Sequence, residues 1–297
     1  MSKSRTTPTA THKQLSWPRR ARPGRWNGTS SGFGGPLYAD LYEQGLLQTI
    51  DHVALGSASM ALTDGAIQPY GLGFHNDAVV LGYSAAAFPD EAPTVADFFD
   101  TTAFPGTRGM TVGGFEDWTR PSLALVADGV APADLIPLDW DRAFETLDPL
   151  KEDIVWYRGG TEMVTLMVEK QAVMCLCSDA RMLQAQKVEP DVRLSFDGGM
   201  RTVIFWAIPE GAPHPRAALE FLRSTLILQR QANFTQKIGY SGVAKEAYDL
   251  LPAELQSQVL VNPNNFPLTF AFTSVQDVWL AEHAAEASEK YATWTGQ

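Results

Sequence analysis

Two consecutive strand-to-helix corners constrain the fold of this chain more than any other feature of its sequence. In each corner a β-prone run, 154–157 or 172–177, ends at small or polar residues able to cap a helix, and a helical pattern follows. At such corners the carboxyl end of a strand and the free N–H groups of a helix face one crevice. The sequence therefore predicts a ligand site where 156–163 and 177–181 meet.

The rest of the chain alternates between strand and helix patterns. Strands are expected at 78–83, 107–112, 154–157, 172–177, 192–196 and 202–208. Helices are expected at 38–47, 118–128, 139–150, 217–228 and 275–294. This alternation, with a helical C-terminal third, predicts an α/β protein with largely parallel sheets.

Composition excludes several classes of function. The 297 residues are 45% hydrophobic and 19% charged, which suffices for one large core or two smaller ones. No stretch approaches the roughly 20 continuous apolar residues of a membrane span. The net charge of −11 argues against a nucleic-acid partner, because phosphates require basic patches.

The first 36 residues differ from the rest. They contain basic residues and no acid, and they are rich in Ser, Thr, Pro and Gly, so we expect them to be disordered. Arg19-Arg20 is not followed by the apolar run of about 7–15 residues that an export signal requires. A cytoplasmic tail, a nucleic-acid arm and a misassigned start are the three interpretations.

Catalytic and metal chemistries find little support. Cys175 and Cys177 lie on one face of a predicted strand without the Cys-x-x-Cys spacing, so buried thiols are expected. The glycine pairs near residues 72 and 113 lack a phosphate-loop lysine or a full dinucleotide fingerprint. The histidines show no metal-ligand spacing. We predict no catalytic residue, no metal and no cofactor.

Several segments, taken in order, resemble polyamine-type extracellular solute-binding proteins. They are 97–110, Asp128-Gly129-Val130, Pro137-Leu138-Asp139, Arg142-Ala143-Phe144, the two corners, Ala207-Ile208-Pro209, Ile238-Gly239-Tyr240 and 279–283. The resemblance covers about residues 37 to 297. It implies a spermidine/putrescine-type ABC importer component that captures a small amine or related cation or zwitterion and delivers it to a membrane permease.

The resemblance also implies a two-lobed, type II periplasmic-binding-protein clamp with two crossover strands. The run 78–83 would leave the first lobe, which comprises 37–85 and 202–297 with the C-terminal helices. Residues 86–201 would form the second lobe, and Tyr240 would face the two corners across the cleft. The protein would then be a carrier rather than an enzyme, with the ligand held between the lobes.

The same resemblance bears on the unusual N-terminus. Family members begin with a signal peptide and a strand-helix-strand unit, and the acid-free segment 1–36 stands in their place. We interpret it as a misassigned start or a shifted reading frame, and the family location as periplasmic. A cytoplasmic protein, a truncated non-functional remnant and an enzyme on the same scaffold are the alternatives.

Ligand contacts follow from the family pattern. A polyamine requires carboxylates for its ammonium groups and aromatic rings for its methylene chain. The family places tryptophans and an aspartate where this chain has Cys177, Thr202 and Ile204, so we expect weak polyamine binding. A smaller amine, or a zwitterion whose carboxylate is held by Arg158, Arg181 or a helix N-terminus, fits better. The ligand-binding candidates are Tyr70, Trp156, Tyr157, Glu162, Cys177, Asp179, Arg181, Thr202 and Tyr240, with Trp206 as a further aromatic.

Each candidate has a structural alternative. The aromatic residues are as well explained by packing in a core. Glu162 and Asp179 fall in the first turns of their helices, where the helix dipole stabilises a carboxylate without a ligand. Arg181 has the alternative of a solvated or ion-paired arginine. The sequence leaves these alternatives open.

Overall fold

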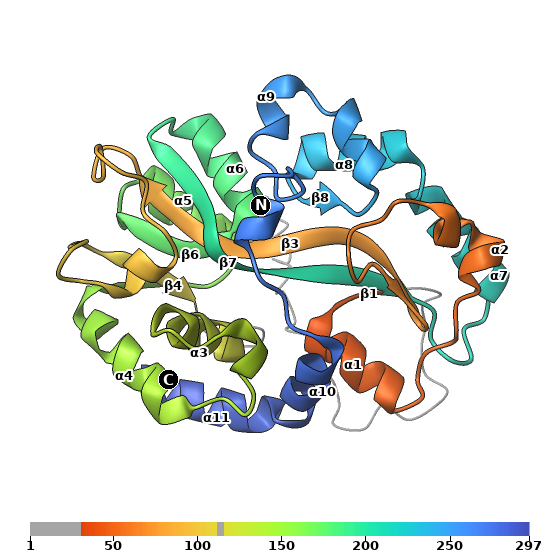
Figure 1. Cartoon of the computed structure of the whole chain (residues 1–297), viewed down its shortest axis with the longest axis horizontal. Helices are drawn as coiled ribbons and strands as arrows, with labels where there is room; N and C mark the ends of the chain where they lie inside the picture. The colour runs from red at the N-terminus through yellow and green to blue at the C-terminus, as the bar shows by residue number, and fades with distance from the viewer. Residues whose placement is uncertain (1–30, 112–115, 297) are drawn as a thin grey trace, which may run out of the picture.

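The computed structural model describes residues 31–111 and 116–296. Two long strands, β3 and β7, run side by side through the middle of the molecule, and helices surround them (Figure 1). The strands are β1 Ser31–Gly34, β2 Ile67–Gln68, β3 Gly71–Ser84, β4 Arg108–Thr111, β5 Ile154–Tyr157, β6 Met174–Ser178, β7 Val192–Ala207 and β8 Ser241–Gly242. The helices are α1 Gly35–Glu43, α2 His52–Leu55, α3 Glu116–Ala127, α4 Trp140–Leu147, α5 Gly160–Val168, α6 Asp179–Val188, α7 Pro215–Thr225, α8 Leu228–Ile238, α9 Ala253–Gln256, α10 Ser274–Glu282 and α11 Ala284–Thr295.

The described strands form one sheet in the order β1-β7-β3-β6-β4-β5, with β2 and β8 also paired to β3. β3 and β7 are antiparallel from the pair Leu72↔Trp206 to the pair Ser84↔Val192. The runs expected to connect the two lobes therefore lie in adjacent strands, as predicted. They adjoin where Asp77 pairs with Thr202.

The direction of the strands differs from the expectation. Only β4–β5 and β4–β6 are parallel, and the other pairs of described strands are antiparallel. The expectation of largely parallel sheets is therefore wrong. The reason is that two crossover strands of opposite direction form the centre of the sheet, and short strands at their ends pair antiparallel to them.

The expected strands 192–196 and 202–208 are one continuous strand. Asp197 and the two glycines after it form an irregularity between the pairs Val79↔Met200 and Leu81↔Ser195. Gly198 has a φ of +76°, and a Cβ at Gly199 would lie 2.9 Å from the carbonyl oxygen of Val79. Two glycines therefore absorb the bulge without ending the ladder.

The expected helix 275–294 is divided into α10 and α11 at His283. α10 packs on α1, whereas α11 packs on α3. Tyr291 of α11 is 1% exposed and belongs to the same core cluster as Leu123 of α3. The last helix therefore lies against elements of segment 86–201, and the division of the chain into lobes by residue number stays a prediction.

The expectation of disorder in 1–36 falls mostly outside the described residues. Within them, 31–34 form β1, which pairs with β7, and α1 begins at Gly35, so for 31–36 the expectation is wrong. The ladder with β7 holds this segment, although its composition is poor in apolar residues. None of the described helices is long and apolar enough to span a membrane.

A buried arginine organises the turn before β4. Arg108 is fully buried, and its guanidinium donates hydrogen bonds to the backbone carbonyls of Phe98, Asp100, Phe104 and Gly106. One side chain thus satisfies carbonyl groups that no strand or helix pairs. Segment 97–108, which contains part of the family-like pattern, owes its conformation to this residue.

We predict that Arg108→Met lowers the free energy of unfolding by about 3 kcal/mol, because the buried carbonyls lose their donors. Urea denaturation followed by circular dichroism measures the change. Arg223→Met is the matched control, since the ion pair of Arg223 with Glu220 is largely exposed and should contribute less than about 1 kcal/mol. Equal losses in both variants would contradict this role of Arg108.

Candidate functional site

The two strand-to-helix corners lie in contact. At the first corner the backbone N–H of Arg158 donates to Oε2 of Glu162 at 2.6 Å, which fixes the chain where α5 begins. At the second corner α6 begins at Asp179, directly after β6. A Cβ at Gly160 would come 2.5 Å from Nε of Arg181, so the arginine of the second corner crosses the helix start of the first. The two corners therefore meet, and their role as a ligand crevice stays a prediction.

Tyr240 closes one side of this crevice. The hydroxyl of Ser178 donates to the hydroxyl oxygen of Tyr240 at 3.3 Å. The turn before Tyr240 packs directly on α6, because a Cβ at Gly239 would lie 3.1 Å from Ala180, and Gly239 has a φ of +100° that favours glycine. The predicted meeting of Tyr240 with the second corner is therefore confirmed.

Two carboxyl groups lie next to Ser178 and Tyr240. Asp179 is fully buried, and its Oδ1 accepts from the N–H groups of Ala78 at 3.4 Å and Ala180 at 2.8 Å. Burial and, after it, the neighbouring Asp77 carboxyl raise the pKa of Asp179 well above its usual value. The side chains of Asp179 and Asp77 interact directly, and the Ser178 hydroxyl lies 3.3 Å from both Oδ1 of Asp77 and the hydroxyl of Tyr240. This acidic pair is arranged to accept a cation.

An uncharged histidine completes this side of the site. The ring of His75 lies 4.8 Å from that of Tyr240 and 5.6 Å from that of Phe234. Burial lowers the pKa of His75 to about 4, so the ring is neutral at pH 7. Nδ1 of His75 is buried without a hydrogen-bond partner. The histidine therefore adds no positive charge that would compete with a cationic ligand.

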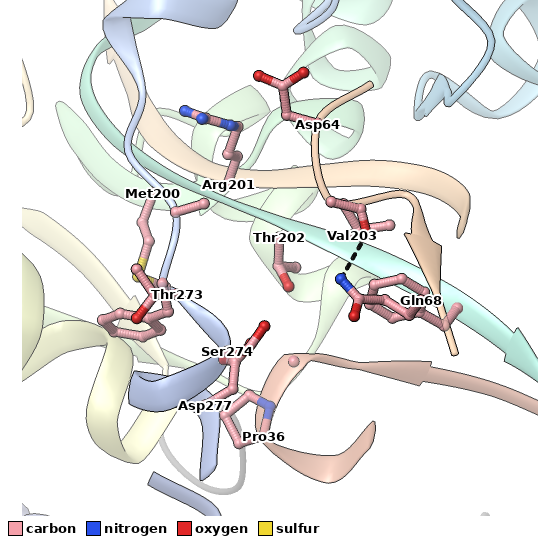
Figure 2. Close-up of a pocket in the computed structure, with 15 residues that line it drawn as sticks. Pro36, Asp64, Gln68, Met200, Arg201, Thr202, Val203, Thr273, Ser274 and Asp277 are labelled. Atoms are coloured by element: carbon pink, nitrogen blue, oxygen red, sulfur yellow. Dashed lines mark hydrogen bonds between the residues drawn. The ribbon is translucent and has the colours of Figure 1, made fainter. Parts of the chain in front are cut away.

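A cavity of about 280 Å³ lies beside this cluster, and we call it the cleft cavity (Figure 2). Thr202 projects from β7 into it, and Pro36, Ser274 and Asp277 form the opposite wall. Thr202 pairs with Asp77 across the ladder, and directly opposed residues of antiparallel strands point to the same face. The acidic pair and the cleft cavity thus share one face of the sheet.

The structure gives six of the sequence-based candidates other contacts. Tyr157 is 1% exposed and donates its hydroxyl to the carbonyl of Leu176, and Cys177 is fully buried. Trp156 packs on Trp294, Glu162 accepts the backbone N–H of Arg158, and Tyr70 lines a different cavity. Trp206 packs among Phe74 and Phe221. Asp179, Arg181, Thr202 and Tyr240 are the candidates that the fold brings to the cleft.

The state of the cysteines differs from the expectation. Cys175 and Cys177 are both buried, as predicted, but a disulfide joins them, with Cα atoms 5.4 Å apart. The expectation of thiols is therefore wrong. Their shared face in β6 explains the pairing, because residues two apart in a strand point the same way. Among the described residues no three His, Cys, Asp or Glu side chains are grouped to hold a metal ion.

Sequence reasoning missed Asp77, Ser178 and His75. Asp77 is the one acidic residue of the otherwise mainly apolar β3, and a charged residue in such a run is a usable signal for a functional position. Ser178 sits at the end of β6 within the second corner. His75 had no sequence signal, because its neighbour Tyr240 is far away along the chain.

Comparison with known proteins identifies the family of this chain. Residues 33–263 match the family model described as bacterial extracellular solute-binding protein. The chain belongs to this family. A gamma-aminobutyric acid-binding protein of Pseudomonas aeruginosa is 26% identical over 260 residues, which are 86% of this chain and 72% of that protein.

Solved structures of solute-binding proteins share the fold. An ABC transporter substrate-binding protein from Bradyrhizobium japonicum is 28% identical, with a TM-score of 0.77 over 90% of this chain and 82% of that one. The spermidine/putrescine ABC transporter substrate-binding protein of Streptococcus pneumoniae is 13% identical, with a TM-score of 0.70 over 90% of this chain and 84% of that one.

The comparisons confirm the fold and the role of a substrate-binding component of an ABC transporter, and the polyamine specificity has only a distant structural neighbour behind it. Solute-binding proteins capture small molecules for ABC transporters outside the cytoplasm and are not enzymes. The spermidine/putrescine protein, at 13% identity, is a distant structural neighbour, whereas the gamma-aminobutyric acid-binding protein is much nearer in sequence. The polyamine resemblance therefore identified the fold more closely than the ligand.

We predict that His75→Phe reduces the loss of stability in acid. The unfolded chain binds a proton at His75 near pH 6.5, whereas the folded protein does so only near pH 4, so stability falls as the pH falls through this window. At pH 5 the stability that the wild-type protein loses through His75 is about 2 kcal/mol. Urea unfolding at pH 7.5 and pH 5 measures it, and His214→Phe, at an exposed position, is the control. An identical pH dependence of wild type and His75→Phe would disprove the assignment.

Proposed function

We propose that this protein is the substrate-binding component of an ABC importer for a small ω-amino acid of the gamma-aminobutyric acid class. The observation that carries the proposal is the buried carboxyl pair of Asp179 and Asp77, with Arg181 and the exposed Arg158 at the two corners beside it. The relation to the gamma-aminobutyric acid-binding protein supports it. A zwitterion with separated charges would meet both kinds of group.

The ammonium end fits the acidic pair. A primary ammonium group donates three hydrogen bonds, and Asp179, Asp77 and the hydroxyl of Tyr240 lie together as acceptors. The positive charge would relieve the cost of burying Asp179 beside a second carboxyl group. The ring of Tyr240 adds an aromatic surface for the adjacent methylene groups.

The carboxylate end fits the arginines. Arg158 is exposed at the first corner, and none of the ion pairs among the described residues involves its guanidinium. Arg181 lies against Gly160, and its Nη1 donates to Gln184. A guanidinium binds a carboxylate through two parallel hydrogen bonds. The start of α5, at Gly160, lies against Arg181 and favours an anion.

Polyamines fit this site less well. Cys177, at a position where polyamine binders have a tryptophan, is buried in a disulfide, and Thr202 and Ile204 supply neither a large ring nor a carboxylate. An additional ammonium group would lie near Arg158 or Arg181. Both features favour a ligand with a single positive charge.

Capture would couple to closure through the paired crossover strands. Ser178 at the end of β6 and Tyr240 in the turn between α8 and β8 are in contact, and β6 and β8 pair with different parts of β3. A ligand that contacts both would stabilise the closed arrangement by its differential affinity for it. The closed protein would then present its ligand to the membrane permease.

We predict saturable binding of gamma-aminobutyrate, with putrescine and spermidine at least about 100-fold weaker. Asp179→Asn and Arg158→Ala should each weaken gamma-aminobutyrate binding by about 100-fold, because a charge-assisted contact is lost. Isothermal titration calorimetry at pH 7.5 provides the measurement.

Glu162→Gln is the matched control, since its carbonyl oxygen still accepts from the N–H of Arg158 and it makes no contact with the acidic pair. This variant should bind gamma-aminobutyrate within about threefold of wild type. Tighter binding of spermidine than of gamma-aminobutyrate would overturn the proposed ligand class, as would wild-type affinity in Asp179→Asn.

A further inference from the structure

A second cavity, of about 230 Å³, lies in the part of the molecule between α1, α10 and the end of β7. Three tyrosines and a phenylalanine line it, so we call it the tyrosine cavity. The residues around it are Tyr38, Ala39, Tyr42, Gln68, Pro69, Tyr70, Phe205, Ser274 and Asp277. Its walls are therefore mainly aromatic, with one carboxyl group.

The rings of the tyrosine cavity are held in place. Tyr42 and Tyr70 are parallel within 7°, with ring centroids 5.9 Å apart, and Tyr38 stacks on Phe205 at 4.6 Å. The hydroxyl of Tyr38 accepts the backbone N–H of Tyr70 at 3.3 Å. A Cβ at Gly71 would come 2.8 Å from the ring of Tyr38, so this glycine allows the close approach. Such a preorganised set of rings needs little ordering when a ligand binds.

Asp277 supplies the negative charge. It lies in the first turn of α10, and none of the ion pairs or side-chain hydrogen bonds among the described residues neutralises it. Burial raises the pKa of Asp277 to about 7. A Cβ at Gly35 would lie 2.8 Å from its Oδ1, so the carboxyl group is packed against the start of α1. The carboxyl group of Asp277 therefore has no positively charged partner among the described residues.

We propose that the tyrosine cavity is a second binding site, which takes a small methylated ammonium cation against the aromatic rings that line it, beside the carboxyl group of Asp277. Aromatic faces attract a diffuse positive charge, and the neighbouring carboxylate balances it. A primary ammonium group would find too few acceptors for its three donors, and a hard metal ion would find one carboxylate where it needs about six oxygen ligands. Methyl groups, by contrast, bury well against rings.

This site is distinct from the crevice at the two corners. The residues that line it include none of Asp77, Arg158, Ser178, Asp179, Arg181 and Tyr240. Asp277 also borders the cleft cavity, which places the tyrosine cavity next to the cleft rather than within the crevice. A cation bound there would contact α1 and α10 together, and the pairing of these helices would become tighter when the site is filled.

Tetramethylammonium chloride is the probe, titrated into the full chain at pH 8.5, where Asp277 is ionised, against sodium chloride of equal ionic strength. Saturable binding to one site is expected by calorimetry or ligand-observed NMR. Asp277→Asn and Tyr42→Leu should each weaken it by about tenfold or more, whereas Tyr42→Phe keeps the ring and should stay within about threefold. A thermal melt of each variant establishes that it is folded.

Binding of the two ligands should be separable. Tyr42→Leu should leave gamma-aminobutyrate binding unchanged, and Arg158→Ala should leave tetramethylammonium binding unchanged. If binding did not saturate up to about 50 mM tetramethylammonium, the binding free energy would be weaker than about 2 kcal/mol, and the proposal would be overturned. Wild-type affinity in folded Asp277→Asn or Tyr42→Leu would do so as well.

Discussion

The antiparallel ladder between β3 and β7 is the interaction on which the rest of the structure depends. Their pairing extends from Leu72 to Ser84, and the ladders of β1, β2, β6 and β8 are built onto its edges or ends. It places Asp77 opposite Thr202, which puts the acidic pair and the cleft cavity on one face. Because side chains alternate along a strand, a slip of one residue would turn these groups to the opposite face.

Local signals in the sequence predicted local structure well. The helix starts after 157 and 178 were recognisable because small and polar residues follow β-prone runs, and both corners are present. The bulge at Asp197–Gly199 was not recognisable, since two glycines after an aspartate indicate a turn as readily as a bulge. Whether this segment forms a turn or a bulge depends on whether a partner strand continues past it, and that partner, β3, is far away along the chain.

The side chains of the site were harder to predict than the fold. Because side chains alternate along a strand, Trp156 and Tyr157 must point to opposite faces of β5. The alternation does not reveal which of the two faces a helix will cover. In this structure helices cover both faces, with α5 and α6 on one side and α11 on the other. Asp179 and Tyr240 were recognisable as polar residues at element ends. Their partners Asp77 and His75 lie within β3, where only the tertiary fold reveals their role.

The buried Asp179 has a consequence for the energetics of uptake. In the empty protein its raised pKa favours a bound proton, and an arriving ammonium group would reverse that preference. Capture of the proposed ligand would then expel a proton into the surroundings, so affinity would increase with pH over the range in which the carboxyl group is partly protonated. The carrier would thus respond to the acidity of its compartment, retaining its ligand in neutral surroundings and surrendering it in acidic ones.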